Sequence, residues 1–185
     1  MTWRRIFAAL LVLCLLGTIP ASASKYGYTV DVETMKMLEA QSSCPVHVTE
    51  KKIVLGTFDE KAFSDEGADS LVITVINGTD SPIASVTVGF IALKEDNSVT
   101  DIKSNLTYQP QGSPEVKRLV RSDLTLAPGE SISLSTRVDY GYFKGVRAMV
   151  SEYTTEDGSV KINPDYKTWE MYAFGLSSTD ATELD

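Results

Sequence analysis

Cysteine and histidine are scarce in this sequence, which has two Cys and one His in 185 residues. Two cysteines cannot build a disulfide scaffold, and so few Cys and His residues exclude most zinc sites. Basic residues are also few: 17 Lys and Arg stand against 25 Asp and Glu, for a net charge of −8. This balance argues against a nucleic-acid binder, which presents a basic face. With 43% hydrophobic and 23% charged residues, the composition is globular.

Only one long hydrophobic run occurs, the eleven residues 6–16. Arg4 and Arg5 precede it, and Ala21-Ser22-Ala23 follows it. A basic start, a short apolar core and a small-x-small site are typical of a secretory signal peptide. A membrane span needs roughly 20 apolar residues. We therefore predict a signal peptide at 1–23, cleavage before Ser24, and a secreted or periplasmic protein without a membrane span.

Removal of the signal peptide changes the length, the net charge and the cysteine count of the chain. Residues 24–185 number 162, and the loss of Arg4 and Arg5 takes the net charge from −8 to −10. Cys14 is lost as well; it lies inside the apolar run after Leu13, which does not fit lipoprotein processing. Cys44 remains as the single cysteine, so no internal disulfide is possible, whereas pairing with another chain stays open.

The rest of the chain is rich in short β patterns separated by turn residues. β-branched or alternating segments occur at 46–55, 71–76, 84–92, 116–120, 132–138, 146–150 and 160–162. In 84–92, one set should face a core, Ala84, Val86, Val88, Phe90 and Ala92, and Ser85, Thr87 and Gly89 should face the other way. About seven strands without long helices predict an all-β, antiparallel immunoglobulin-like β-sandwich.

Four segments follow from these patterns: the signal peptide 1–23, an N-terminal extension 24–45, the β-sandwich 46–176 and an acidic tail 177–185 that we expect to be disordered. Within the extension, Val32, Met35 and Leu38 recur every three residues. This spacing predicts a short helix through Ala40.

Three segments carry a resemblance to a known family. They are Val72-Ile73-Thr74-Val75-Ile76-Asn77-Gly78-Thr79-Asp80-Ser81-Pro82-Ile83, Val88-Gly89-Phe90-Ile91-Ala92-Leu93-Lys94-Glu95-Asp96-Asn97 and Leu126-Ala127-Pro128-Gly129-Glu130. Together they resemble the FxLYD-type and related immunoglobulin-like domains of bacterial exported proteins, with Ala92-Leu93-Lys94 where Leu-Tyr-Asp stands in that family. The resemblance implies an extracytoplasmic β-sandwich without enzymatic activity.

Motifs for catalysis or metal binding are weak. Cys44 and His47 have a C-x-x-H spacing, but zinc needs two further ligands that no spacing selects. Residues 67–71 resemble a lipase serine block only faintly, and the single histidine lies upstream of them. The acidic stretch 59–69 lacks the D-x-[DN]-x-[DN]-G pattern of a calcium loop. We predict no catalytic, cofactor or metal residues, with Cys44 as a free, small hydrophobic thiol and His47 as an exposed strand residue.

Aromatic residues are unevenly distributed, with eight of the 14 in residues 24–185 falling in the last 46. Exposed Tyr and Trp are favoured in interfaces and in sugar-binding sites. We name as candidate binding residues Tyr140, Tyr142, Phe143 and Trp169. The alternative is that Trp169 and its neighbours Tyr172 and Phe174 pack as a final strand or as a cover over the sandwich.

These observations predict an exported, non-catalytic binding or structural module with an unknown protein or glycan partner. The alternative is a carbohydrate-binding module that uses the C-terminal aromatics; an enzyme is the third class. Asn77 and Asn105 begin Asn-x-Thr triplets. Because the resemblance is bacterial, we interpret Asn77 as a turn residue rather than as a glycosylation site.

Overall fold

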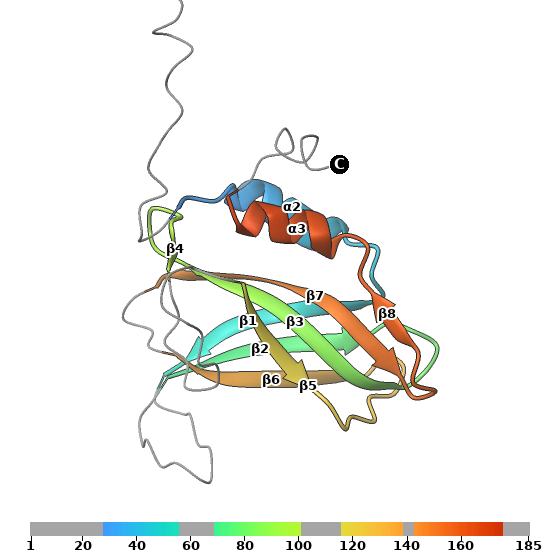
Figure 1. Cartoon of the computed structure of the whole chain (residues 1–185). Coiled ribbons are helices and arrows are strands. Elements are labelled where there is room, and N and C mark those ends of the chain that lie inside the picture. Colours follow the sequence, from blue (N-terminus) through green and yellow to red (C-terminus); the bar gives the residue numbers. More distant parts are fainter. Residues whose placement is uncertain (1–27, 56–68, 101–115, 139–142, 176–185) are drawn as a thin grey trace, which may run out of the picture.

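A computed structural model describes residues 28–55, 69–100, 116–138 and 143–175 (Figure 1). The elements in chain order are α2 (Val32–Gln41), β1 (Val46–Val54), β2 (Asp69–Asn77), β3 (Ile83–Leu93), β4 (Val99–Thr100), β5 (Lys117–Arg121), β6 (Ser131–Val138), β7 (Gly145–Thr155), β8 (Val160–Ile162) and α3 (Tyr166–Ala173). The expected strand segments are all present, and the helix predicted through Ala40 is confirmed as α2. The predicted signal peptide and acidic tail lie outside the described residues.

The strands form two antiparallel sheets. One has the order β1-β2-β6; in the other, β3 is central, with β4 and β5 on one side and β7 followed by β8 on the other. The all-β expectation is therefore confirmed in its general form. No helix within the described ranges is long and apolar enough to cross a bilayer.

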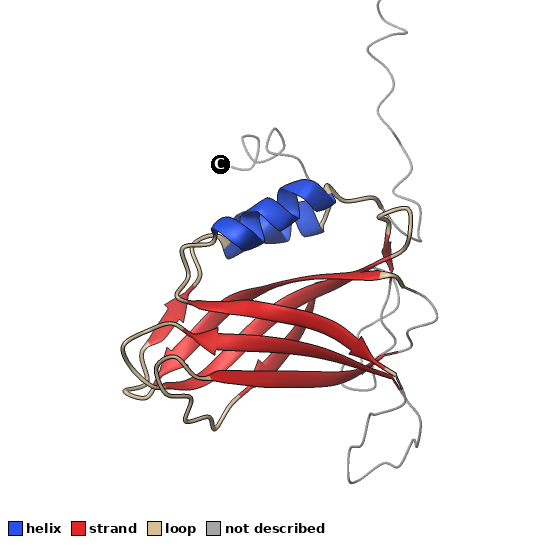
Figure 2. Ribbon diagram, turned by 180° about the vertical axis from the view of Figure 1, so that it is seen from behind, coloured by secondary structure: helices blue, strands red, loops and turns tan. Residues whose placement is uncertain are grey.

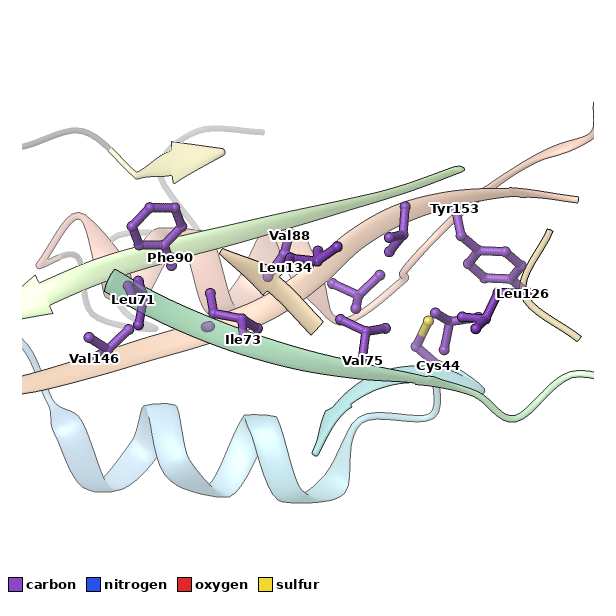
Figure 3. Packing of buried hydrophobic residues seen from close by; sticks show 14 of the residues in the cluster. Cys44, Leu71, Ile73, Val75, Val88, Phe90, Leu126, Leu134, Val146 and Tyr153 are labelled. Carbon is purple, nitrogen blue, oxygen red and sulfur yellow. The ribbon is translucent and has the colours of Figure 1, made fainter. Parts of the chain in front are cut away.

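The main core lies between the two sheets. Leu71, Ile73 and Val75 of β2 point toward Val88 and its neighbours on the facing sheet (Figure 3). Full burial of such aliphatic side chains stabilises the fold by about 1.5–3 kcal/mol each. The alternation read in the sequence thus selects the residues that fill this core.

β3 is buried on both of its faces, which the alternation alone does not predict. Val86, Val88 and Phe90 face the main core, as expected. Thr87 and Gly89 point away from it, but that second face is covered at Gly89 by Tyr166. Figures 1 and 2 show why: α2 and α3 lie side by side over the β3–β7 sheet, so the layers are helices, five-stranded sheet and three-stranded sheet.

A second core fills the space beneath the two helices. Ile91 and Met149 reach it from the sheet, Met35 from α2, and Trp169 from α3. Because the helical layer buries apolar side chains of its own, the segment before β1 belongs to the packed structure.

The C-terminal aromatic segment is a helix, so a final strand, one of its two predicted arrangements, is wrong. Pro164 and Asp165 precede α3, and proline is favoured where a helix begins. Tyr166, Trp169 and Ala173 are spaced by three and four residues and form the buried face of α3. The other arrangement, a cover over the sandwich, is correct for Trp169.

Candidate functional site

One mostly buried carboxylate joins four elements, and we call its surroundings the Glu39 junction. Glu39 Oε2 accepts from Lys51 Nζ on β1 at 2.6 Å and from Arg147 Nη1 on β7 at 3.4 Å. Glu39 Oε1 accepts from the Ala148 backbone N–H at 3.1 Å and from Trp169 Nε1 on α3 at 3.2 Å. The Glu39 side chain is only 11% exposed.

Helical geometry explains how an acid reaches this place. Glu39 follows the fully buried Met35 by four residues, so both lie on the face of α2 that packs on the sheet. The sequence signal for this site is an acid four residues after a core residue of α2, and we did not predict the site from it.

The Glu39 junction is a structural cross-link between the helices and the sheet. Four donors occupy the carboxylate, so little capacity remains for it to accept a further proton donor. Its charge offsets the charges of Lys51 and Arg147, which are themselves mostly buried. β8 pairs only with residues 152–154 of β7, so it does not reach Ala148. The Glu39 carboxylate accepts from the Ala148 backbone N–H and so provides this edge group of β7 with a hydrogen-bond partner.

A small cavity of about 20 Å³ adjoins the junction. Its lining comes from α2, β1, β7 and the loop before α3: Glu39, Ser42, Val46, His47, Val48, Lys51, Ala148, Met149, Val150 and Asn163. A cavity needs roughly 10–15 Å³ to hold one water. The space therefore suits a water molecule and is too small for a metabolite.

A second polar link ties the end of α2 to the start of α3. Asp165 Oδ2 accepts from the backbone N–H of Ser43 at 2.8 Å and from the hydroxyls of Ser43 and Ser42 at 3.1 and 3.2 Å. These hydrogen bonds lower the pKa of the Asp165 carboxyl, the Ser43 backbone N–H contributing most. Asn163 completes the link, because its side-chain amide donates to the carbonyl of Val150 at 2.7 Å.

Two of the four predicted binding residues lie in the interior. Trp169 is 0% exposed, donates its indole N–H to Glu39 and stacks on Tyr166 with ring centroids 5.6 Å apart. Phe143 is buried in the main core. Stacking on a partner needs an exposed ring face, so packing removes both from the candidate surface. Tyr140 and Tyr142 lie outside the described residues, and the glycan alternative rests on them.

The other residues singled out from the sequence have structural environments. Cys44 is buried in the main core, and this burial raises the pKa of its thiol. His47 is exposed, with Nδ1 3.2 Å from the carbonyl of Pro45. No group of three or more Cys, His, Asp or Glu side chains converges in the described ranges. Asn77 is the fully buried last residue of β2, and its side-chain amide donates to the carbonyls of Ser81 and Leu126, so it holds the turn that follows the strand.

The five-stranded sheet extends beyond the helical layer. Strand pairing aligns Ile162, Glu152, Thr87 and Val120 across β8, β7, β3 and β5 on the face that carries the helices. Tyr166 covers the adjoining row at Gly89; in this row Thr87 is buried, whereas Glu152, Val120 and Ile162 are exposed. We call the exposed surface, made of Val120, Glu152, Ile162 and the neighbouring Val160, the open end.

Large aliphatic side chains stand at both edges of the open end. Val120 is 63% exposed on β5, and Val160 and Ile162 are 59% and 75% exposed on β8. Glu152 and Thr87 lie between them, with the Thr87 hydroxyl 3.4 Å from Glu152 Oε1. Scattered exposed aliphatics are ordinary on a protein surface. Here three exposed aliphatic side chains lie on one face of the sheet, on either side of the polar residues Glu152 and Thr87.

Comparison with known proteins gives a family and a fold. No curated protein matches the chain. A solved structure of a hypothetical protein from Peptoclostridium difficile 630 is similar, with 14% identity, a TM-score of 0.50, and coverage of 72% of this chain and 93% of that one. This likeness concerns the fold alone. Residues 70–175, from β2 through α3, match the model of a family of unknown function, DUF5780. Neither match is to an FxLYD-type domain. The chain belongs to the DUF5780 family.

Proposed function

We propose that this protein is an exported, non-catalytic binding module that holds a protein partner at the open end of its sheet. The observation that carries the proposal is the exposure of Val120, Val160 and Ile162 on one face, at both edges of the same sheet. A partner that covered them would remove apolar surface from water and gain hydrophobic free energy.

Strand order supports an immunoglobulin-like scaffold for such a module. On this proposal, β1, β2 and β6 would take the places of strands A, B and E, and β3, β7 and β8 those of strands C, F and G. β5 departs from the simplest form of that fold because it joins β3 at the sheet edge. Scaffolds of this kind present binding surfaces on a rigid core.

The Glu39 junction supports a non-catalytic role. A general base must be able to accept a proton from a substrate. The Glu39 carboxylate is instead engaged by Lys51, Arg147, Ala148 and Trp169. Its arrangement serves to hold the helices on the sheet.

Site-specific photo-crosslinking in producing cells tests the proposal. A photo-reactive residue at Ile162 should give an adduct, and one at Met37, which is also exposed but lies on α2, should not. Added mature protein should compete for that adduct, whereas the V120D/I162D variant should not. Identical adducts at both positions, or equal competition by the variant, would refute binding at the open end. Export is tested separately by fractionation and N-terminal sequencing, which should give Ser24.

A further inference from the structure

β5 is an edge strand with a concentrated positive charge. Residues 117–121 read Lys-Arg-Leu-Val-Arg, and no acid occurs from Val116 to Ser122. The whole chain carries a net charge of −8, so this strand contrasts with the rest of the protein. It borders the open end, to which it contributes Val120.

The backbone of β5 has one paired edge. Its residues pair with β3 from Val86↔Arg121 to Phe90↔Lys117, and no other described strand pairs with it. The opposite edge of a strand presents N–H and C=O groups that can bind a further strand. In Figure 1, β5 is the short gold arrow that begins beside β3.

Two arginines stand on this edge in accessible positions. Arg118 is 60% exposed, with Nη2 3.4 Å from Glu170 Oε1 at the border of the helical layer. Arg121 is exposed at the end of the strand. Successive residues along a strand alternate between its two faces, so Arg118 and Val120 share the face of the open end, whereas Leu119 and Arg121 lie on the face toward the main core.

We propose that β5 is the docking edge for an extended acidic segment of a protein partner, which adds to the sheet as a new strand. The inference rests on the proposed function, because it names the partner chemistry for the surface at the open end. Backbone hydrogen bonds would supply affinity, and carboxylates beside Arg118 and Arg121 would supply selectivity. A β-branched residue between the acids would cover Val120.

Charge argues against a second copy of this chain as the occupant. Pairing β5 with another β5 would bring arginines together, and pairing it with β8 would bring Lys161 to the same basic edge. Like charges in such positions destabilise strand pairs. An acidic strand would instead place opposite charges beside the arginines of β5.

Fluorescence anisotropy with labelled peptides on the mature chain 24–185 tests the inference. The probe is acetyl-Val-Glu-Val-Thr-Glu-Val-amide, whose two acids are three residues apart, like Arg118 and Arg121, with a valine between them to lie beside Val120. Two comparison peptides separate the contributions: Lys replaces Glu in the first, and Pro replaces the second Val in the other, which removes one backbone donor. Hexameric polyphosphate serves as an anion that cannot form a strand.

Matched charge variants locate the binding. R118Q/R121Q should weaken binding of the acidic probe by about tenfold, from the loss of two charge pairs. K36Q/K167Q removes the same charge from the helical layer and should change the affinity less than about twofold. Binding should also weaken as salt is raised.

Each outcome either supports or overturns strand addition at β5. Binding of the acidic probe alone, lost in R118Q/R121Q and in the Pro peptide, supports strand addition at β5. Equal binding of polyphosphate, or an equal loss in K36Q/K167Q, overturns it in favour of general charge attraction. An absence of acidic-probe binding also overturns it. In that case an Ile162 crosslink that persists would leave the proposed binding function standing, and only the partner chemistry would fail.

Discussion

The hydroxyl of Tyr166 lies directly over Gly89, so close that a Cβ at position 89 would be only 2.1 Å from it. This contact brings α3 onto the face of β3 that points away from the main core. Gly89 is therefore required for close packing, and no positive φ accounts for it. The helical layer depends on the absence of a side chain at this one strand position.

The first prediction concerns that contact. G89A should destabilise the fold by about 1–3 kcal/mol, because Tyr166 must move out of a packed core. Urea unfolding followed by fluorescence measures this, since Trp169 is the single tryptophan in residues 24–185. G145A is the control: its Cβ would meet Leu93 at an ordinary 4.0 Å. Equal stability of the two variants would show that the Tyr166 contact is not tight.

The second prediction concerns the hydroxyl itself. Tyr166 Oη is buried and has no hydrogen-bond partner among the described residues, and burial raises its pKa, with the nearby charge of Glu170 adding to the effect. A buried donor without a partner costs about 1–3 kcal/mol. Y166F should therefore leave stability unchanged or raise it by about 1 kcal/mol. A clear loss of stability would mean that this hydroxyl makes a favourable interaction.

The third prediction concerns the Glu39 junction. E39Q should destabilise the fold by about 3 kcal/mol, since it leaves Lys51 and Arg147 mostly buried without their counter-charge. It should also shift the emission of Trp169, which would lose a charged acceptor. E33Q on the same helix is the control, because Glu33 is exposed and its pair with Lys36 is worth less than about 1 kcal/mol. Unfolding curves that coincide for E39Q and E33Q would contradict the role of Glu39 as a cross-link between the helices and the sheet.

The fourth prediction concerns acid stability. The pKa of Asp165 is lowered in the folded protein, so its contribution is present above the ordinary value of 3.8 and is lost as the pH falls through the lower folded pKa. D165N should reduce stability at pH 7 and show a smaller further loss below pH 3.8 than the unmodified chain. D80N changes an exposed turn acid instead and should keep the parent profile. Parallel pH profiles for D165N and the parent would refute the Asp165 link.

Local sequence patterns were sufficient for the strands and for α2. The alternation of Val86, Val88 and Phe90 identified the core face because each strand residue points opposite to its neighbour. A run of three-residue spacings located α2 in the same way. These features depend on residues close together in the chain.

Other features required the folded chain. Trp169 is a plausible surface aromatic by sequence, but its burial depends on α3 packing over β3 and on Gly89 leaving room for Tyr166. The Glu39 junction needs donors 12 to 130 residues away, and no local pattern specifies such distant partners.

The sequence by itself therefore determined the all-β class, the main core and the turn role of Asn77, because backbone preference and side-chain alternation act locally. Only the tertiary structure decided which part of the second face of the five-stranded sheet is covered by the helices and which part is open. That outcome depends on how two helices from opposite ends of the described chain meet on β3 and β7, joined through Glu39. The same packing leaves Val120 and Ile162 exposed and assigns the binding surface proposed for this protein.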